Sequence, residues 1–282
     1  MKNNKAIFCF TVKNEEKSLK KKFALIDKVK LIFKDYHLVY VLSDCTDNSE
    51  RMISSYLKNN NYKGKLIIKN FNSNEKRLLK LEKSRNAYLD YIKSDDNLKK
   101  YDYLLVMDVD GVNNLLNTKK LTNSLNSRIN WTAIFANQEL FYYDLFALRI
   151  KGIFEENCFD EILKNYLNNK KFPLNNLFKE KLLKNFKIIK KHPDNYIKVE
   201  SAFGGFGIYK LINVINSKAY YCSNNGKDCE HIHFNKLISK KYDGLFIDKQ
   251  LTNSIGLNTH VLNAFLCSYF EIFAKRFIKK IS

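Results

Sequence analysis

The sequence predicts an α/β fold in which helices flank a mostly parallel central sheet. Between residues 5 and 108, short apolar segments alternate with longer segments of helical periodicity. Strands that alternate with helices at this spacing are typical of parallel sheets with right-handed crossovers. The chain has 282 residues, 45% of them hydrophobic, which is enough to bury a sizeable core.

The first half alternates regularly. We expect strands at residues 5–12, 38–43, 65–69 and 103–108, and helices at residues 15–33, 50–58 and 75–92.

The second half is less regular. We expect a helix at 116–125, a strand at 131–137, a helical stretch at 160–190 broken at Pro173, strand-like segments at 199–209 and 219–222, and a helix after Cys229. Internal repeats and low-complexity linkers are absent from the sequence, which favours a single domain over residues 1–260 with a divergent second half.

The last segment, residues 261–282, has apolar residues at near-helical spacing and a late basic cluster of Lys275, Arg276, Lys279 and Lys280. Two interpretations remain open. A basic amphipathic helix lies on an anionic bilayer, whereas a terminal helix packs on the core and keeps its basic face in water.

Composition limits the partners and the compartment. The formal net charge is +20, but the lysines are scattered and no nucleic-acid-binding motif is present, so we expect no nucleic acid partner. Nucleotide phosphates and an anionic membrane surface remain as partners. The six cysteines lack Cys-x-x-Cys spacing, and no signal peptide or membrane-spanning stretch is recognisable. We expect a cytoplasmic protein, soluble or peripheral on the inner face of the membrane.

Asp108 and Asp110 close the apolar run at 103–107. Alternate residues of an extended segment point the same way, and the carboxyl end of a strand is where open α/β sheets bind ligands. Two carboxylates there can share a hard divalent cation, Mn²⁺ or Mg²⁺, which in turn holds a diphosphate. The alternative is a pair of solvated turn aspartates.

Polar residues at three other places could line the same site: after the first predicted strand, after the second, and on the helix that precedes the fourth. Thr11, Asn14 and Glu15 end the first strand and can contact a base or ribose. Asp44 ends the second strand and can accept a hydrogen bond from a pyrimidine ring NH. Arg85, on the helix before the aspartates, can reach a diphosphate with its forked donors.

Together these segments resemble the GT-A glycosyltransferases. Asn14-Glu15-Glu16 is similar to their "RNE" strand end, residues 44–49 to their "DSTDxT" loop, Ser84-Arg85-Asn86 to their "ARN" helix, and Asp108-Val109-Asp110 to their DXD motif. Lys13 and Cys45 replace the usual arginine and serine. The resemblance implies a GT-A, Rossmann-like fold with a nucleotide-binding half at residues 1–112 and an acceptor half at 113–260.

The second half adds two similar elements. Residues 142–149 resemble a "YYDxWAxR" stretch of capsule-associated mannosyltransferase-like enzymes, with Tyr143, Asp144 and Arg149 as acceptor-binding candidates. The alternative is a core strand with a structural Asp/Arg pair. Gly204 and Gly205 resemble a "GGxxIY" element that brings backbone close to the donor sugar.

Residues 228–235 contain the densest group of ionisable side chains. In the GT-A pattern an acidic residue here deprotonates the acceptor hydroxyl, which makes Glu230 the candidate base. His231 and His233 are alternative metal ligands, which share a face if the segment is extended and do not if it is helical.

The sequence therefore predicts a metal-dependent glycosyltransferase that transfers a sugar from a nucleotide diphosphate donor to a glycan or lipid-linked acceptor, in synthesis of cell-surface polysaccharide or lipopolysaccharide. Two alternatives remain. A metal-dependent nucleotidyltransferase shares the paired carboxylates, but Asn14 and Glu15 stand where its glycine-rich phosphate loop belongs. A noncatalytic sugar- or nucleic-acid-binding protein would tolerate loss of Asp110.

Overall fold

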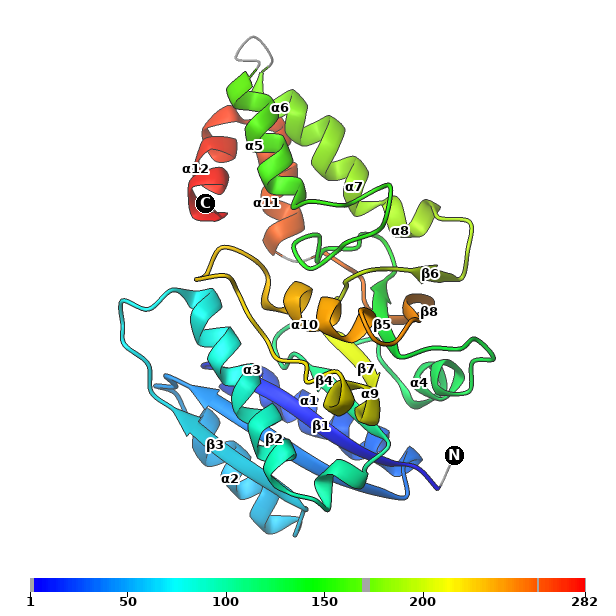
Figure 1. Ribbon diagram of the computed structural model, residues 1–282. Coiled ribbons are helices and arrows are strands. Elements are labelled where there is room, and N and C mark those ends of the chain that lie inside the picture. Colours follow the sequence, from blue (N-terminus) through cyan, green and yellow to red (C-terminus); the bar gives the residue numbers. More distant parts are fainter. Residues whose placement is uncertain (1–2, 169–172, 258, 282) are drawn as a thin grey trace.

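The computed structural model describes residues 3–168, 173–257 and 259–281. Its centre is an eight-stranded sheet with the strand order β3-β2-β1-β4-β7-β5-β8-β6. Helices cover both faces of the sheet, and a group of further helices stands beyond one end of it (Figure 1). Parallel pairs outnumber antiparallel pairs among the described strands. The predicted α/β class and mostly parallel sheet are confirmed.

The first half has the predicted alternation of elements. In chain order it contains β1 (Lys5–Val12), α1 (Glu16–Val29), η1 (Lys30–Ile32), β2 (Asp35–Ser43), α2 (Ser49–Asn59), β3 (Gly64–Lys69), α3 (Arg77–Ser94), η2 (Leu98–Lys100) and β4 (Tyr103–Met107). All four strands pair in parallel, so their carboxyl ends meet at one edge of the sheet.

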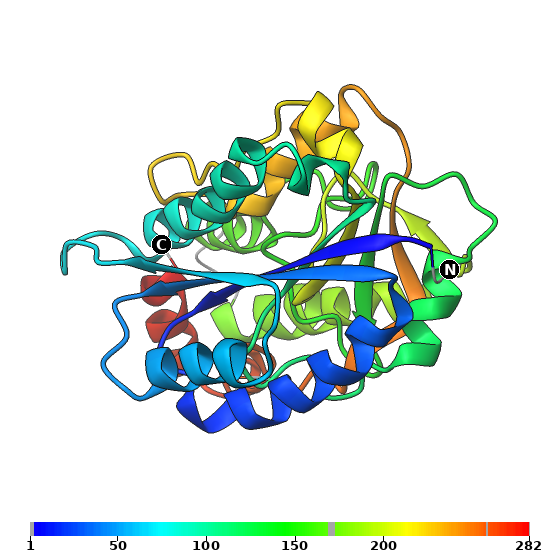
Figure 2. The same cartoon turned by 90° about the horizontal axis from the view of Figure 1, so that it is seen from below.

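Side chains that alternate along β1 fill two different cores. Ile7 and Cys9 pack in the cluster that contains Tyr88 of α3, whereas Phe8 and Phe10 pack in the cluster that contains Leu19 of α1. Figure 2 shows α3 on one face of the sheet and α1 with α2 on the other. Strands covered on both faces consist of continuous apolar runs, which is why the sequence revealed them.

The second half completes the sheet with α4 (Thr118–Leu125), β5 (Ala133–Gln138), β6 (Tyr196–Lys198), β7 (Phe206–Lys210), α9 (Leu211–Asn216), α10 (Glu230–Ser239) and β8 (Leu245–Ser254). Strand β7 lies antiparallel between β4 and β5. The predicted strand at 199–209 is wrong in extent, because Gly204 and Gly205 have φ of 64° and 80° and the strand begins only at Phe206. The predicted strand at 219–222 is wrong. Its Tyr221 backbone bonds instead to the Asn86 side chain of α3.

The remaining helices form a helical lobe above the sheet in Figure 1. They are α5 (Cys158–Asn168), α6 (Leu174–Leu177), η3 (Phe178–Leu183), α7 (Lys184–Phe186), α8 (Ile188–Lys191), α11 (Thr259–Tyr269) and α12 (Glu271–Ile281). The helical stretch expected at 160–190 is found as α5 before Pro173 and as α6, η3, α7 and α8 after it, and residues 169–172 lie outside the described part of the chain. The C-terminal segment, expected as one helix, forms two that meet at Phe270; its last residue, Ser282, is outside the described residues. Within the described part of the chain, we find no helix with the length and apolar character needed to cross a bilayer.

Candidate active site at the carboxyl edge of the sheet

Arg85 joins three separate parts of the chain. Its side chain on α3 is 4% exposed, and its Nε donates to Glu230 Oε1 at 2.9 Å. Its Nη2 donates to Asp108 Oδ1 at 3.3 Å. Its Nη1 is buried and has no hydrogen-bond partner among the described residues. Three side chains predicted for the site, from α3, the end of β4 and the start of α10, therefore meet.

The charges at this meeting point are unbalanced. Burial raises the pKa of Asp108 to about 7, with the neighbouring charges of Asp110 and Asp144 acting in the same direction and Arg85 opposing them. Burial by itself would lower the pKa of Arg85, but Tyr88, Glu230 and Asp108 raise it above its ordinary value. Arg85 stays charged, while several carboxylates compete for its single positive charge.

Asp110 lies at the open side of this group. Its side chain is exposed, and Oδ1 accepts from Val112 N at 3.2 Å, so Asp110 also closes the turn that follows β4. Lys22 of α1 supports that turn from beneath, because its buried Nζ donates to Val112 O and to Asn114 Oδ1. Burial lowers the pKa of Lys22, whereas Asp110 raises it. The sequence analysis did not identify Lys22.

Gly204 and Gly205 bring backbone close to the same turn. A Cβ at Gly204 would lie 2.8 Å from Ala136 O, and one at Gly205 would lie 2.7 Å from Tyr143 Oη. Because both residues also have positive φ, only glycine fits them without strain.

A network of buried amides holds the diglycine against the aspartate turn. Asn253 of β8 donates to Gly204 O at 2.7 Å and to Asn113 Oδ1 at 2.8 Å. Asn113 donates in turn to the backbone oxygens of Asp108 and Gly205, each at 2.9 Å. Sequence reasoning missed both asparagines, because nothing in the sequence around them marks either one as buried.

Tyr143 and Asp144 lie on a half-buried loop beside the diglycine, rather than on a core strand. Asp144 accepts from Gly204 N at 3.0 Å and from Ala147 N at 3.4 Å, and burial raises its pKa. Arg149 is buried, and its Nη1 donates to Leu148 O at 2.7 Å and Phe146 O at 3.3 Å. Among the described residues we find no ion pair between Asp144 and Arg149. The Arg149 side chain stabilises the loop by donating to the loop's backbone carbonyl oxygens.

His231 and His233 lie on a helix and therefore do not share a face. His231 is buried and stacked on Phe203, with ring centroids 3.9 Å apart, and its Nε2 lies 3.8 Å from Glu230 Oε1. His233 is half-buried beside Tyr220. No cluster of three or more His, Cys, Asp or Glu side chains able to hold a metal occurs within residues 3–168, 173–257 and 259–281. The structure thus does not assemble the histidines with the two aspartates.

The ends of β1 and β2 are tied together. Thr11 is half-buried near the end of β1, and Asn14, with φ of 54°, accepts from Thr46 N at 2.7 Å. Glu15 N donates to Ser49 Oγ at 2.8 Å, and burial raises the pKa of the Glu15 carboxyl.

Asp44 has φ of 50°, and its carboxylate accepts from Phe71 N at 2.7 Å and from Lys80 Nζ at 2.8 Å. These bonds fix the loop that follows β3 against the carboxyl end of β2.

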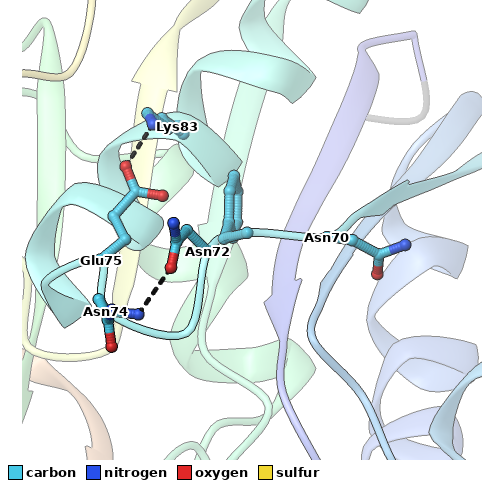
Figure 3. A pocket seen from close by; sticks show the side chains of 6 residues that line it. Asn70, Asn72, Asn74, Glu75 and Lys83 are labelled. Carbon is cyan, nitrogen blue, oxygen red and sulfur yellow. Dashed lines mark hydrogen bonds and ion pairs between the residues drawn. The ribbon is translucent and has the colours of Figure 1, made fainter.

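An open cavity of about 460 Å³ adjoins Asp44 and was not predicted. It is lined by Asn70, Phe71, Asn72, Asn74, Glu75 and Lys83 (Figure 3). Glu75 and Lys83 form an ion pair at one side, and Asn74 N donates to Asn72 Oδ1 at 3.0 Å. The cavity thus combines one aromatic ring with amides at the carboxyl end of β3.

Comparisons with known proteins identify the fold. No family model matches the sequence, and no curated protein matches it. Among solved structures, the mannosyltransferase PcManGT from Pyrobaculum calidifontis, in complex with GDP-Man and Mn²⁺, has a TM-score of 0.56 at 10% identity over 95% of this chain. TarS 1-349 from S. aureus has a TM-score of 0.49 at 11% identity over 86% of this chain.

The chain spans 61% of the length of the first structure and 57% of the second. At this identity the likeness shows the fold alone. The GT-A fold that the motifs implied is therefore confirmed: the chain shares its fold with the named mannosyltransferase, and its paired aspartates lie at the carboxyl edge of the sheet. In open α/β sheets generally, this edge is where ligands bind.

Proposed function

We propose that the protein is a metal-dependent glycosyltransferase that moves a sugar from a nucleotide diphosphate donor to a glycan or lipid-linked acceptor. The observation that carries this proposal is Arg85, buried between Asp108 and Glu230 with Nη1 unpaired in the described structure. A buried donor without a partner is costly, and an anionic diphosphate would satisfy it.

The cavity beside Asp44 is proposed as the nucleobase pocket. Phe71 offers a ring for stacking, and the amides of Asn70, Asn72 and Asn74 can both donate and accept at a base edge. Asp44 shapes this pocket through its bond to Phe71 N. This modifies the direct role for Asp44 that the sequence suggested. Thr11, Asn14 and Glu15 border the ribose, and Gly204 and Gly205 admit the donor sugar.

Asp108 and Asp110 fit a hard divalent cation, Mn²⁺ or Mg²⁺, because both offer carboxylate oxygens and Asp110 is exposed. The like charges that help to raise the pKa of Asp108 would be relieved by a cation. Two protein ligands leave the other positions to the diphosphate and water, and a bound cation would stabilise charge on the departing diphosphate. The named mannosyltransferase was solved with Mn²⁺. We do not include His231 and His233 among the proposed metal ligands. The side chain that contacts Asp108 is Arg85, and the described structure does not bring the histidines together with the two aspartates.

The chain's own groups divide the remaining work. Arg85 stabilises the charge that develops on the diphosphate, and in turning toward it releases Glu230. Glu230 then takes the proton of the acceptor hydroxyl, and direct action as a base inverts the anomeric centre. Tyr143 and Asp144 hold the acceptor sugar through ring contact and hydrogen bonds, on a loop that Arg149 stabilises.

Purified protein incubated with a panel of nucleotide sugars and Mn²⁺ or Mg²⁺ tests this proposal by the release of nucleotide. We expect one donor to be cleaved, with cleavage abolished by chelator. The test includes glycan and lipid-linked acceptors. If the protein then binds a nucleotide sugar but neither cleaves it nor transfers its sugar, the noncatalytic alternative is favoured. The proposed setting is synthesis of cell-surface polysaccharide or lipopolysaccharide at the inner face of the membrane.

A further inference from the structure

The C-terminal helices leave a large apolar surface uncovered. One side of α11 is buried in the helical lobe through Val261, Ala264 and Cys267. On the other side, Leu262, Leu266 and Tyr269 recur at the spacing of one helix face. The apolar surface comprises six side chains that are 41–75% exposed: Leu262, Leu266, Tyr269, Phe270, Ile272 and Phe273. Phe270 and Phe273 also contact each other where the two helices meet, with ring centroids 5.8 Å apart. Exposed apolar residues gathered on two successive helices in this way mark interaction sites.

Basic side chains border the apolar surface. Lys275, Arg276 and Lys279 follow it on α12, and all three are exposed. One of these charges is partly offset, because Lys275 Nζ lies 3.2 Å from Glu271 Oε1. Aromatic and aliphatic side chains flanked by Lys and Arg are the composition of helices that lie in the headgroup region of anionic bilayers.

This surface lies at the same edge of the sheet as the candidate active site. Strand β8 is parallel to β5, and both run in the direction of β4 because β7 is antiparallel to each of its neighbours. The carboxyl end of β8 therefore lies at the edge that carries Asp108, and the chain continues from there into α11. Figures 1 and 2 both place α12 near the start of α3, which carries Arg85.

We propose that the apolar surface and its basic border dock the protein on an anionic lipid bilayer, with the active-site edge close to the lipid surface. A second copy of the chain fits less well, because a symmetric contact would bring the two basic borders together. That this docking delivers a lipid-linked acceptor rests on the proposed function, whereas the docking itself does not.

Flotation with vesicles of phosphatidylglycerol and phosphatidylcholine tests the apolar part. We expect binding to the anionic vesicles and little binding to pure phosphatidylcholine. The double variant Phe270→Ser with Ile272→Ser should bind at least about tenfold more weakly, since apolar burial drives insertion. The matched control is Leu31→Ser with Ile212→Ser, whose side chains are 70% and 54% exposed elsewhere. It should bind as the wild type does.

Charge variants test the basic part. Lys275→Gln, Arg276→Gln and Lys279→Gln together should weaken binding by roughly 100-fold, about fivefold for each charge. The charge-matched control, Arg51→Gln with Lys58→Gln and Lys119→Gln, removes three exposed charges from α2 and α4 and should change binding much less. Binding of the wild type should weaken as salt rises.

Two outcomes would overturn the proposal. One is vesicle binding that the surface variants leave unchanged. The other is a concentration-dependent dimer that the Phe270 and Ile272 variants dissociate, without vesicle binding by the wild type. Release of nucleotide from the donor, measured in the same variants without vesicles, should stay at the wild-type level. If the wild type itself releases no nucleotide from any donor, that result counts against the proposed function and not against docking.

Discussion

The guanidinium of Arg85 and the carboxylate of Glu230 are 145 residues apart in the sequence and 2.9 Å apart in space. Both side chains are 4% exposed. Removing one partner of a buried ion pair leaves the other charge uncompensated, which typically costs about 3–5 kcal/mol. Substitutions that test the role of Glu230 must therefore keep an acceptor for Arg85.

Glu230→Gln meets that requirement, because its amide oxygen can still accept from Arg85 Nε. If Glu230 is the base, the variant should bind donor nucleotide normally and lose turnover by roughly 10²- to 10⁴-fold. Calorimetry gives the nucleotide affinity and released nucleotide gives the turnover. Glu156→Gln, at an exposed position in the helical lobe, is the control and should keep both values.

A different result would reassign Glu230. Weaker nucleotide binding with little change in turnover at saturating donor would show that Glu230 only positions Arg85. Glu230→Ala should in either case unfold at lower denaturant, since it removes the acceptor altogether.

Asp110→Asn should abolish transfer while the fold persists. The amide oxygen can still accept from Val112 N, so the turn is kept, but a neutral amide is a poor ligand for a divalent cation. We expect turnover to fall by at least about 100-fold, and the Mn²⁺ concentration at half activity to rise. Asp243→Asn removes an 80% exposed carboxylate far from the site and serves as control. Wild-type turnover in Asp110→Asn, or in excess chelator, would exclude the metal-dependent proposal.

Stability without metal should depend on the ionisation of Asp108. Burial raises the pKa of this carboxyl to about 7 in the folded protein, above its ordinary value. The folded state therefore binds more protons than the unfolded state between about pH 4 and 7, so the contribution of Asp108 to stability declines as pH rises through that window. Urea unfolding of wild type and Asp108→Asn should show it: the variant gains stability relative to wild type as pH rises. A pH-independent difference would contradict the raised pKa.

Metal binding should follow the same ionisation. A cation competes with the proton on Asp108, so Mn²⁺ affinity should rise by about tenfold per pH unit below pH 7 and level off above it. Titration calorimetry from pH 5.5 to 8 measures this dependence. A flat profile would place the cation elsewhere.

The first half was predictable because β1, β2 and β4 are covered on both faces, which leaves apolar runs such as residues 103–107. The edge strand β3 is more exposed and was recognised from its place in the alternation of strands and helices. The second half was predictable only in part: α4, β5 and α10 lie where a helix, a strand and a helix were expected, whereas β6 and β8 were not expected. The burial of β8 does not alternate regularly, and the strand carries Asp248 and Asn253 among its buried residues, so its sequence pattern does not stand out from that of a loop. Within residues 219–222, Ala219 and Tyr221 are buried in the cluster that contains Tyr88 of α3, and the segment does not form a strand.

The site divides in the same way. Asp108 and Glu230 lie at element ends, Arg85 lies in the middle of α3, and all three fall in segments that resemble family patterns, so the sequence identified them. Nothing in the sequence indicated that Arg85 would bond to both carboxylates. Contacts between residues this distant in the chain depend on how β7 and α10 pack, which local patterns do not encode. Lys22 was missed for a related reason: on a lysine-rich helix, nothing distinguishes the one lysine that is buried.

Two glycines of the site should respond differently to alanine. At Gly205, φ is 80° and a Cβ would lie 2.7 Å from Tyr143 Oη and 2.8 Å from Val112 Cγ2, so Gly205→Ala adds backbone strain of about 1–3 kcal/mol and pushes the acceptor loop away from the aspartate turn. At Gly111, next to Asp110, no atom lies within 4 Å of a built Cβ. Gly205→Ala should therefore lose both stability in urea unfolding and turnover, whereas Gly111→Ala should keep its stability and most of its turnover. Equal losses in the two variants would mean that the DXD turn itself requires glycine, and that close packing between Gly205 and Tyr143 is not what shapes the acceptor side.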